Sequence, residues 1–400
     1  MQTETDRTDE QKNDETNVLL EAGYNYVEGT PQPQPICRPA FTLIELRNAI
    51  PPHCFERSMV KSFGYLLRDV VTIISLLCCS FIIFEHQSVP FCFTAIAYPV
   101  YWFVQGSFLF GVWVLAHECG HGAFSESDCV NDIVGLIVHS ALLTPYHSWK
   151  ITHRKHHSNT SSCENDLAFV PFTEQEISQS PWSHHLLNDS PLFNLVKAIY
   201  FLLLGWPAYL GINASGPSKY RNRPNSHFNP NAEFFSSTNR RSVILSDIGF
   251  VLALAAIGYC VYIFNFFLVW RLYIVPYLVM NGYLVLITLL HHTDTYVPHF
   301  RSREWSWLRG SLSTIDRSYG TFLDTVLHHI TDTHVCHHIF SKMPFYHCVE
   351  ATEAIKPILG NYYLRDETPI LVALWRAITH CIYVQNDGQV VFYKKSLTNK

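Results

Sequence analysis

Charged side chains are scarce in this sequence. Asp, Glu, Lys and Arg make up 15% of its 400 residues, whereas 48% of the residues are hydrophobic and 14% are aromatic. Soluble domains carry charge at about a quarter of their positions, so this composition disfavours a soluble protein and favours an integral membrane protein. The sequence also lacks a basic stripe, which argues against nucleic acid as a partner.

Three further features are missing. The 12 cysteines stand at irregular positions, which is typical of reduced thiols and not of an extracellular disulfide framework. No Gly-rich fingerprint for a flavin or a nicotinamide is present, so if the protein catalyses a redox reaction, its electrons must come from outside the chain. No signal-peptide pattern opens the chain, because residues 1–40 are polar, acidic and proline-containing. We predict a disordered cytosolic tail there and one membrane domain over residues 41–395.

Long apolar runs, in contrast, are present. We predict four transmembrane helices, at about residues 66–84, 91–116, 243–265 and 272–290. Short segments join the first to the second and the third to the fourth, so the four helices are expected to form two hairpins. The predicted fold class is therefore an all-α integral membrane protein, with a cytosolic helical cap built from the rest of the domain.

Histidine is abundant, with 22 residues, most of them in tight clusters. At this frequency the pattern H-x-x-H-H is expected about 0.07 times per chain by chance, so two copies indicate a shared purpose. Spacings of i, i+3 and i+4 place imidazoles on one face of a helix. Eight clustered histidines exceed what one ion can take, which implies two metal ions. The clusters are His117-Glu-Cys-Gly-His121, His153-Arg-Lys-His156-His157 and His334-Val-Cys-His337-His338.

Ligand type narrows the choice of metal. Imidazole suits zinc, copper, iron and nickel alike. A two-zinc hydrolase would usually add bridging carboxylates, and soluble di-iron bundles show E-x-x-H pairs that this chain lacks. An all-imidazole pair of ions beside a membrane bundle fits iron that activates oxygen.

Two other hypotheses are open at this point. His117-Glu118-x-x-His121 also matches the H-E-x-x-H motif of zinc proteases, in which Glu118 would be the general base. That reading leaves the two H-x-x-H-H clusters without a role. The second of these hypotheses is a non-catalytic metal-binding membrane receptor.

A shared site also constrains the topology. The three clusters can meet only on one side of the membrane, so the apolar stretches Ile133–Leu143 and Leu192–Gly211 are expected to be interfacial or buried, not spanning. The positive-inside rule agrees, because the loop Glu85–Pro90 carries no Lys or Arg. We therefore expect four spans, with both termini in the cytosol.

The three clusters resemble the three histidine boxes of the membrane fatty-acid desaturases. The resemblance covers about residues 40–395 and is closest to the methyl-end branch, the Δ12 (oleate) desaturases of fungi, plants and invertebrates. The most branch-specific stretch is Met343-Pro-Phe-Tyr-His347, followed by Glu350–Gly360. Further supporting stretches are Ala49–Ser58, Ala116–His121, Leu204–Tyr209 and Asp332–His338.

The resemblance implies an activity and partners. An oxygen-dependent di-iron enzyme would introduce a cis double bond at the Δ12 position of an oleoyl chain, giving linoleate by two successive hydrogen abstractions. Two Fe ions, O2 and electrons from cytochrome b5 and its reductase would be needed. The resemblance also implies a multi-pass protein of the endoplasmic reticulum membrane with a cytosolic active site. A phospholipid or an acyl-CoA can carry the chain, and ω3 desaturase, hydroxylase, acetylenase and conjugase activities remain open.

A ninth ligand is implied as well. Relatives use a histidine just after the last span, where this chain has His291 and His292. The methyl-end branch usually has Gln-His-Thr there, which aligns His292 with the ligand and His291 with the glutamine. Thr288 departs from the asparagine of acyl-CoA relatives, which puts their water-mediated ligand in doubt here. The expected metal ligands, which are also the catalytic residues, are His117, His121, His153, His156, His157, His292, His334, His337 and His338.

Neutral imidazoles leave the charge of oxidised iron largely uncompensated. Carboxylates are therefore expected to hold the outer ring N–H groups of the ligands. The other histidines are expected at surface, interfacial or outer positions. The candidate carboxylates are Glu118, Asp166, Asp294 and Asp332.

Overall fold

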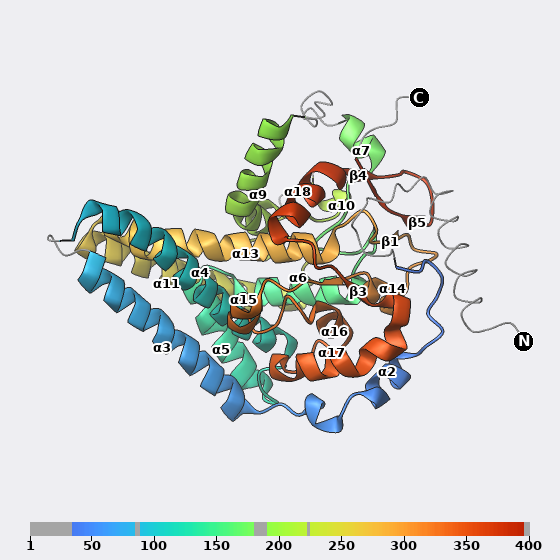
Figure 1. Ribbon diagram of the computed structural model, residues 1–400, viewed down its shortest axis with the longest axis horizontal. Coiled ribbons are helices and arrows are strands. Elements are labelled where there is room, and N and C mark those ends of the chain that lie inside the picture. The colour runs from blue at the N-terminus through green and yellow to red at the C-terminus, as the bar shows by residue number, and fades with distance from the viewer. Residues whose placement is uncertain (1–33, 85–88, 180–189, 222–224, 396–400) are drawn as a thin grey trace, which may run out of the picture.

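The structure is a computed structural model. It describes residues 34–84, 89–179, 190–221 and 225–395 (Figure 1). Most of the expected tail, residues 1–33, lies outside the described residues. Helices dominate the described part, and the only strands there form three two-residue pairs: β1 (His299–Phe300) with β5 (Val390–Val391), β2 (Ile315–Asp316) with β3 (Leu364–Arg365), and β4 (Tyr383–Val384) with β6 (Tyr393–Lys394).

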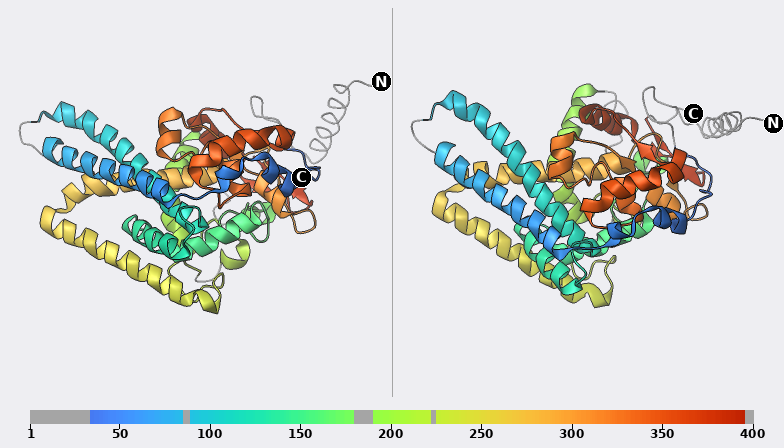
Figure 2. Two further views of the ribbon diagram at one scale, coloured as in Figure 1. Left: turned by 90° about the horizontal axis from the view of Figure 1, so that it is seen from below. Right: turned by 60° about the horizontal axis from the view of Figure 1, so that its bottom comes forward.

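Two hairpins of long helices project from the rest of the molecule (Figures 1 and 2). The first consists of α3 (Met59–Phe84) and α4 (Phe91–His121). The second consists of α11 (Arg240–Phe264) and the continuous run from Phe266 to His292, which contains α12 (Phe266–Val269), the π-helical turn η3 (Trp270–Ile274) and α13 (Val275–His292). Each of these four stretches is long and apolar enough to cross a membrane.

Each helix extends beyond its predicted span at one end or both, since α3 begins at Met59 and α11 at Arg240. Helix α4 begins at Phe91 as predicted but runs on through His121, and Gly122 ends it in the left-handed conformation with φ 73°. The second hairpin turns at Asn265, which has φ 81° and whose side chain accepts a hydrogen bond from the Leu268 N–H. The run after this turn therefore starts six residues before the predicted 272. Arg271 lies inside the π-helical turn of this run.

Packing distinguishes the helices of the hairpins. α3 and α11 expose large apolar side chains, such as Leu67 at 65% and Leu252 at 65%, as expected of faces that meet lipid. α4 is buried in its second half and packs against α13. Gly106 permits this approach, because a Cβ there would lie 2.6 Å from the Val279 side chain.

Two apolar stretches were expected not to span the membrane. Residues 133–143 fall largely in α5 (Asp128–Ala141), which meets α6 (Tyr146–Asn159) at a bend of 108°. Residues 192–211 form most of α9 (Pro191–Ile212), which is long and apolar enough to be a fifth span. Figure 1 shows, however, that α9 runs across α13 and not alongside it.

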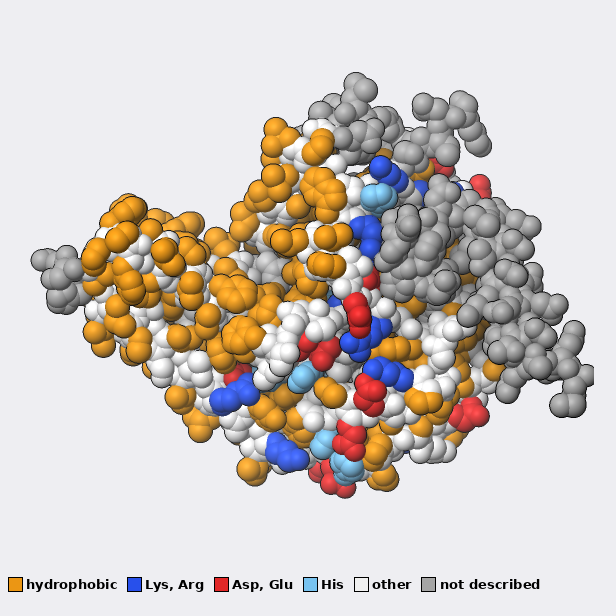
Figure 3. Space-filling model, viewed as in Figure 1, with side chains coloured by type: hydrophobic (Ala, Val, Ile, Leu, Met, Phe, Trp, Pro, Cys, Tyr) orange, Lys and Arg blue, Asp and Glu red, His pale blue; other side chains and the backbone are white. Residues whose placement is uncertain are grey.

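The remaining short elements form a cap at one end of the hairpins (Figure 2). The space-filling view shows the same division (Figure 3). Apolar side chains cover the projecting hairpins and α9, and most of the charged side chains in this view lie over the rest of the molecule. The short elements are α2 (Leu43–Ala49), η1 (Pro52–Phe55), α7 (Glu174–Gln179), α10 (Ser218–Arg221), η2 (Ser237–Asn239), α14 (Trp307–Leu312), α15 (Thr321–Val326), α16 (His334–Ile339), α17 (Phe345–Leu359), η4 (Gly360–Tyr362) and α18 (Ile370–His380).

Candidate metal centre

The first histidine cluster lies at the C-terminal end of α4. Because the helix continues through His121, His117 and His121 share one face, and their Nε2 atoms are 3.2 Å apart. Gly120 packs against Trp149 of α6, and a Cβ at this position would lie 2.9 Å from the indole. The small residue in this cluster thus lets α6 approach α4.

The second cluster lies on α6, which crosses close to the end of α4. His153 Nε2 lies 3.0 Å from His117 Nε2 and 3.1 Å from His157 Nε2. The Trp149 indole stacks on the His153 ring with centroids 4.5 Å apart. His156 Nδ1 turns outward to the Asp166 carboxylate at 2.9 Å.

The third cluster lies on α16 and meets the end of α13. His334 Nε2 approaches His292 Nε2 to 3.0 Å, and the His338 ring stacks on the His157 ring at 4.1 Å. His338 Nδ1 lies 3.2 Å from the Thr160 hydroxyl, which leaves Nε2 facing the other imidazoles.

The nine predicted ligands come together as two adjoining groups. One group contains His117, His121, His153, His157 and His337, and each offers a ring nitrogen within 4.8 Å of those of the others. The other group contains His156, His292 and His338 by the same measure, and His334 adjoins it through His292.

The spacing of the nitrogens fits metal binding. Nitrogens that share one metal ion, with bonds of about 2.05–2.2 Å, lie about 3.1–3.4 Å apart. Four Nε2 pairs here lie at 3.0–3.2 Å. His337 Nε2 and His338 Nε2 are buried without a hydrogen-bond partner among the described residues, which costs about 1–3 kcal/mol each unless an ion binds them. The group of five offers more donors than the four of a tetrahedral zinc, so the donor set fits ions of higher coordination number, such as iron.

Burial also sets the protonation state of the ligands. It is the largest cause that lowers the pKa of His153, His157, His337 and His338 well below the usual 6.5, and neighbouring imidazoles lower it further. Burial likewise lowers the pKa of His334 to about 3. These rings are therefore neutral at physiological pH, and the neutral form is the one that binds metal.

Two of the four candidate carboxylates contact a predicted ligand. Asp166 accepts from His156 and also from the Ala168 N–H at 2.9 Å, so the turn after α6 fixes its position. Glu118 lies 3.4 Å from His117 Nδ1 and accepts from the Phe345 N–H at 3.1 Å. Glu118 thus faces the outer side of His117, away from the Nε2 atoms, where a zinc-protease base would not act.

The Asp166 contact leads to a prediction. Asp166→Ala removes the acceptor that orients His156, so we expect iron affinity to fall about 10- to 100-fold. Asp166→Asn keeps an acceptor and should lose less. Iron content of the purified protein after dialysis against a graded chelator measures the effect. Exposed Asp128→Asn is the control, and equal iron retention in all three variants would contradict a positioning role for Asp166.

The other two carboxylates bind elsewhere. Asp332 contacts His329 at 3.0 Å, a histidine outside both groups. Asp294 accepts from Arg317 at 2.9 Å and from Arg376 at 2.6 Å. The expectation that these two hold the outer nitrogens of metal ligands is therefore wrong.

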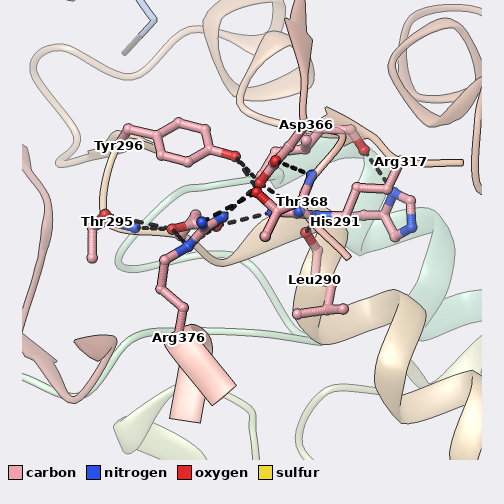
Figure 4. A network of polar contacts seen from close by, with 10 residues as sticks. Leu290, His291, Thr295, Tyr296, Arg317, Asp366, Thr368 and Arg376 are labelled. Carbon is pink, nitrogen blue, oxygen red and sulfur yellow. Dashed lines mark hydrogen bonds and ion pairs between the residues drawn. The ribbon is translucent and has the colours of Figure 1, made fainter. Parts of the chain in front are cut away.

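Arg317 anchors a buried ionic network beside the end of α13. Its Nε donates to the Leu290 carbonyl at 2.9 Å and its Nη1 to Asp366 at 2.5 Å. Figure 4 shows Arg317 and Arg376 converging on Asp366, with the Tyr296 hydroxyl on the same carboxylate. With Asp294, the network balances two guanidinium groups with two carboxylates, and it fixes the segment that carries His292.

The structure separates the two candidates for the ninth ligand. His292 joins the second group, whereas His291 Nδ1 lies 2.6 Å from the Ile315 carbonyl. Thr288 is exposed and its hydroxyl donates to the Leu284 carbonyl within the helix, so it faces away from the site. The geometry thus favours His292.

The other histidines lie outside both groups among the described residues. Several are buried with partners of their own: His227 lies 3.0 Å from the Thr152 hydroxyl, and His328 lies 2.7 Å from Asp69. His86, His184 and His185 lie outside the described residues. Sequence reasoning missed the contacts of Trp149 and Thr160 with the site, because neither residue carries a metal-ligand signature.

These features define a class of protein. It is a helical membrane protein with a histidine-rich candidate metal centre, assembled from the ends or faces of α4, α6, α13 and α16. A family model described as fatty acid desaturase matches residues 94–368, and a model described as a domain of unknown function matches residues 1–78. The chain belongs to the fatty acid desaturase family, whose members are oxidoreductases.

Known relatives cover nearly the whole chain. It is 46% identical over 377 residues to a Delta(12)-oleate desaturase of Trichosanthes kirilowii, covering 92% of this chain and 100% of that protein. It is 47% identical to an omega-6 fatty acid desaturase, endoplasmic reticulum isozyme 1, of Glycine max, covering 88% and 89%. It is 43% identical to a Delta(12) fatty acid desaturase of Mortierella alpina, covering 89% and 91%.

Proposed function

We propose that this protein is a Δ12 desaturase that converts an oleoyl chain to a linoleoyl chain. The reaction removes two hydrogens from adjacent methylenes, and O2 takes up these hydrogens, two electrons and two protons to give two waters. The observation that carries the proposal is the pair of buried imidazole groups, in a chain 46% identical to a Delta(12)-oleate desaturase.

Nine histidines would hold the metals. His117, His121, His153, His157 and His337 would bind one iron, and His156, His292, His334 and His338 would bind the second. The bound iron pair would supply the oxidising power that no side chain offers for an unactivated methylene.

The protein's own groups prepare this centre. Burial keeps the ligand rings neutral without a proton to displace, and it excludes water that would quench an oxidant. Asp166 holds the Nδ1 proton of His156 and so turns Nε2 inward. Glu118 links α4 to the start of α17 through the Phe345 N–H, which keeps the first and third clusters in register.

The remaining parts of the proposal concern topology and partners. The two hairpins would give four spans, and α9 would lie at the interface because it crosses α13. The protein would reside in the endoplasmic reticulum membrane, as the name of the Glycine max relative suggests, with its site facing the cytosol. Electrons would come from cytochrome b5 and its reductase, and the acyl chain would be presented on a phospholipid or on CoA.

Product analysis tests the proposal. Expression in a yeast that lacks polyunsaturated lipids should produce a new 18-carbon diene with double bonds at positions 9 and 12, identified by gas chromatography–mass spectrometry. An 18-carbon triene, or a hydroxylated, acetylenic or conjugated product, would replace the Δ12 assignment with a sister activity. The absence of any new lipid, with the protein well expressed and reductase present, would contradict the desaturase proposal.

A further inference from the structure

A second cluster of metal-ligand side chains lies apart from the nine histidines. His53 and Cys54 stand on η1, and His347 and Glu350 stand on α17, so residues up to 297 positions apart in sequence meet here. Each residue offers one ligand atom, and all four atoms lie within 4.8 Å of one another. Both segments belong to stretches that resemble methyl-end desaturases, and neither supplies an iron ligand.

The distances within this cluster suit a small tetrahedral ion. His53 Nε2 lies 3.7 Å from Cys54 Sγ, close to the separation of about 3.6 Å that zinc imposes between a nitrogen and a thiolate ligand. His53 Nε2 lies 2.9 Å from Glu350 Oε2, and the His53 and His347 rings meet edge to face with centroids 5.4 Å apart. Small movements of the half-exposed His53 and Glu350 side chains would separate their ligand atoms enough to admit an ion.

Charge and accessibility agree with the geometry. A thiolate and a carboxylate together balance a divalent ion, and two neutral imidazoles complete four ligands. Cys54 is fully buried, whereas the His53 and Glu350 side chains are 52% and 50% exposed. The cluster is therefore closed on the protein side and open to an ion from solvent. A thiolate with two imidazoles selects zinc over magnesium or calcium, which prefer oxygen ligands.

We propose that His53, Cys54, His347 and Glu350 bind one structural zinc ion. The ion ties the segment that precedes α3 to α17, the helix that follows the third histidine cluster. Because α17 also bonds to Glu118 through Phe345, the zinc stabilises the cap around the iron ligands without touching them. The site does not depend on the desaturase proposal, because it shares no residue with the nine histidines.

Cobalt substitution distinguishes this site from the iron centre. The full-length protein, purified in detergent and stripped by chelator, is titrated with Co2+ and followed by absorption. A thiolate ligand gives a sulfur-to-cobalt charge-transfer band in the near ultraviolet, which an all-imidazole site does not. Cys119 packs against Phe124 and Tyr146, away from this cluster, whereas Cys336 packs in the same core as Cys54, so the band must be assigned by the Cys54 variant. We expect one band-forming cobalt per chain, displaced by Zn2+.

Variants assign the ligands. Cys54→Ala should abolish the band. Loss of a residue that only orients a ligand costs about 10- to 100-fold in metal affinity, so His347→Gln and Glu350→Gln, which remove ligands, should weaken zinc binding at least as much. Glu353→Gln, one turn further along α17 and exposed, is the matched control and should bind as the wild type does. The His347 and Glu350 variants keep the test decisive if Cys54→Ala fails to fold.

Metal analysis of the untreated protein completes the test. Mass spectrometry should find one zinc per chain, lost in Glu350→Gln while the iron content stays unchanged. A wild-type protein that gives no thiolate band, or equal zinc affinity in Glu350→Gln and Glu353→Gln, would overturn the proposal and leave a hydrogen-bonded His53–Glu350 pair.

Discussion

Replacing His337 by alanine is expected to abolish formation of the new diene in yeast. Its ring belongs to the group of five and lies 4.8 Å, centroid to centroid, from the rings of His117, His121 and His157. Removing the imidazole would leave the proposed iron site without one of its ligands. Because even the loss of an outer partner costs about 10- to 100-fold in metal affinity, we expect the product to fall by more than about 100-fold. Gas chromatography–mass spectrometry of the fatty acids measures it.

The control for this variant is another histidine on the cap. His380 ends α18, lies outside both groups and contacts Thr379, so His380→Ala should retain the diene. Iron content of the purified His337→Ala protein should fall together with the product. Wild-type levels of diene from His337→Ala would contradict the assignment of this ring to the metal centre.

Local periodicity explains why the ligands could be predicted from the sequence. An i, i+4 spacing becomes a shared face only if the helix continues, and α4 does continue through His121 until Gly122 ends it. The same reasoning brought together the histidines of α6. The pairing of His292, not His291, with the other rings depended on family resemblance, because adjacent residues at a helix end differ only in the direction that packing gives them.

Long-range contacts explain what the sequence could not predict. Asp294 stands two residues after His292 and looks like its partner, yet Arg317 and Arg376 bind it across 23 and 82 residues. The cluster that joins His53 to Glu350 spans 297 residues and carries no local motif. In both cases the partners are set by how the cap folds over the hairpins. Hydropathy, likewise, cannot tell a helix that crosses α13, such as α9, from one that runs beside it.

Breaking the buried ionic network by one conservative substitution is expected to destabilise the folded protein strongly. Asp294→Asn leaves two guanidinium groups, Arg317 and Arg376, facing one carboxylate, and Arg317 is fully buried. An uncompensated buried charge of this kind costs about 3–5 kcal/mol. Thermal unfolding of the purified variant measures the loss. Since Arg317 also bonds to the Leu290 carbonyl next to the His292 segment, iron content should fall as well.

The pKa of Asp366 predicts how the network responds to acid. Burial raises this pKa. The positive charge of Arg317, hydrogen bonds from Thr368 and the positive charge of Arg376 outweigh burial, and they lower the pKa from 3.8 to about 2. Because the carboxylate form is favoured in the folded state, the stabilisation is fully present above the unfolded value of 3.8. It is lost as the pH falls toward 2, so at neutral pH the network should be intact and Asp294→Asn should show its whole effect.

Two comparisons separate this network from ordinary surface pairs. Glu367→Gln removes the partner of Arg365 in an ion pair whose side chains are 79% and 47% exposed, and it should cost less than about 1 kcal/mol. Combining Asp294→Asn with Arg376→Met removes one charge of each sign and should recover part of the stability, because the remaining Arg317–Asp366 pair is balanced again. If Asp294→Asn unfolds at the same temperature as Glu367→Gln, or if the double variant is less stable than Asp294→Asn alone, charge balance is not what holds the end of α13.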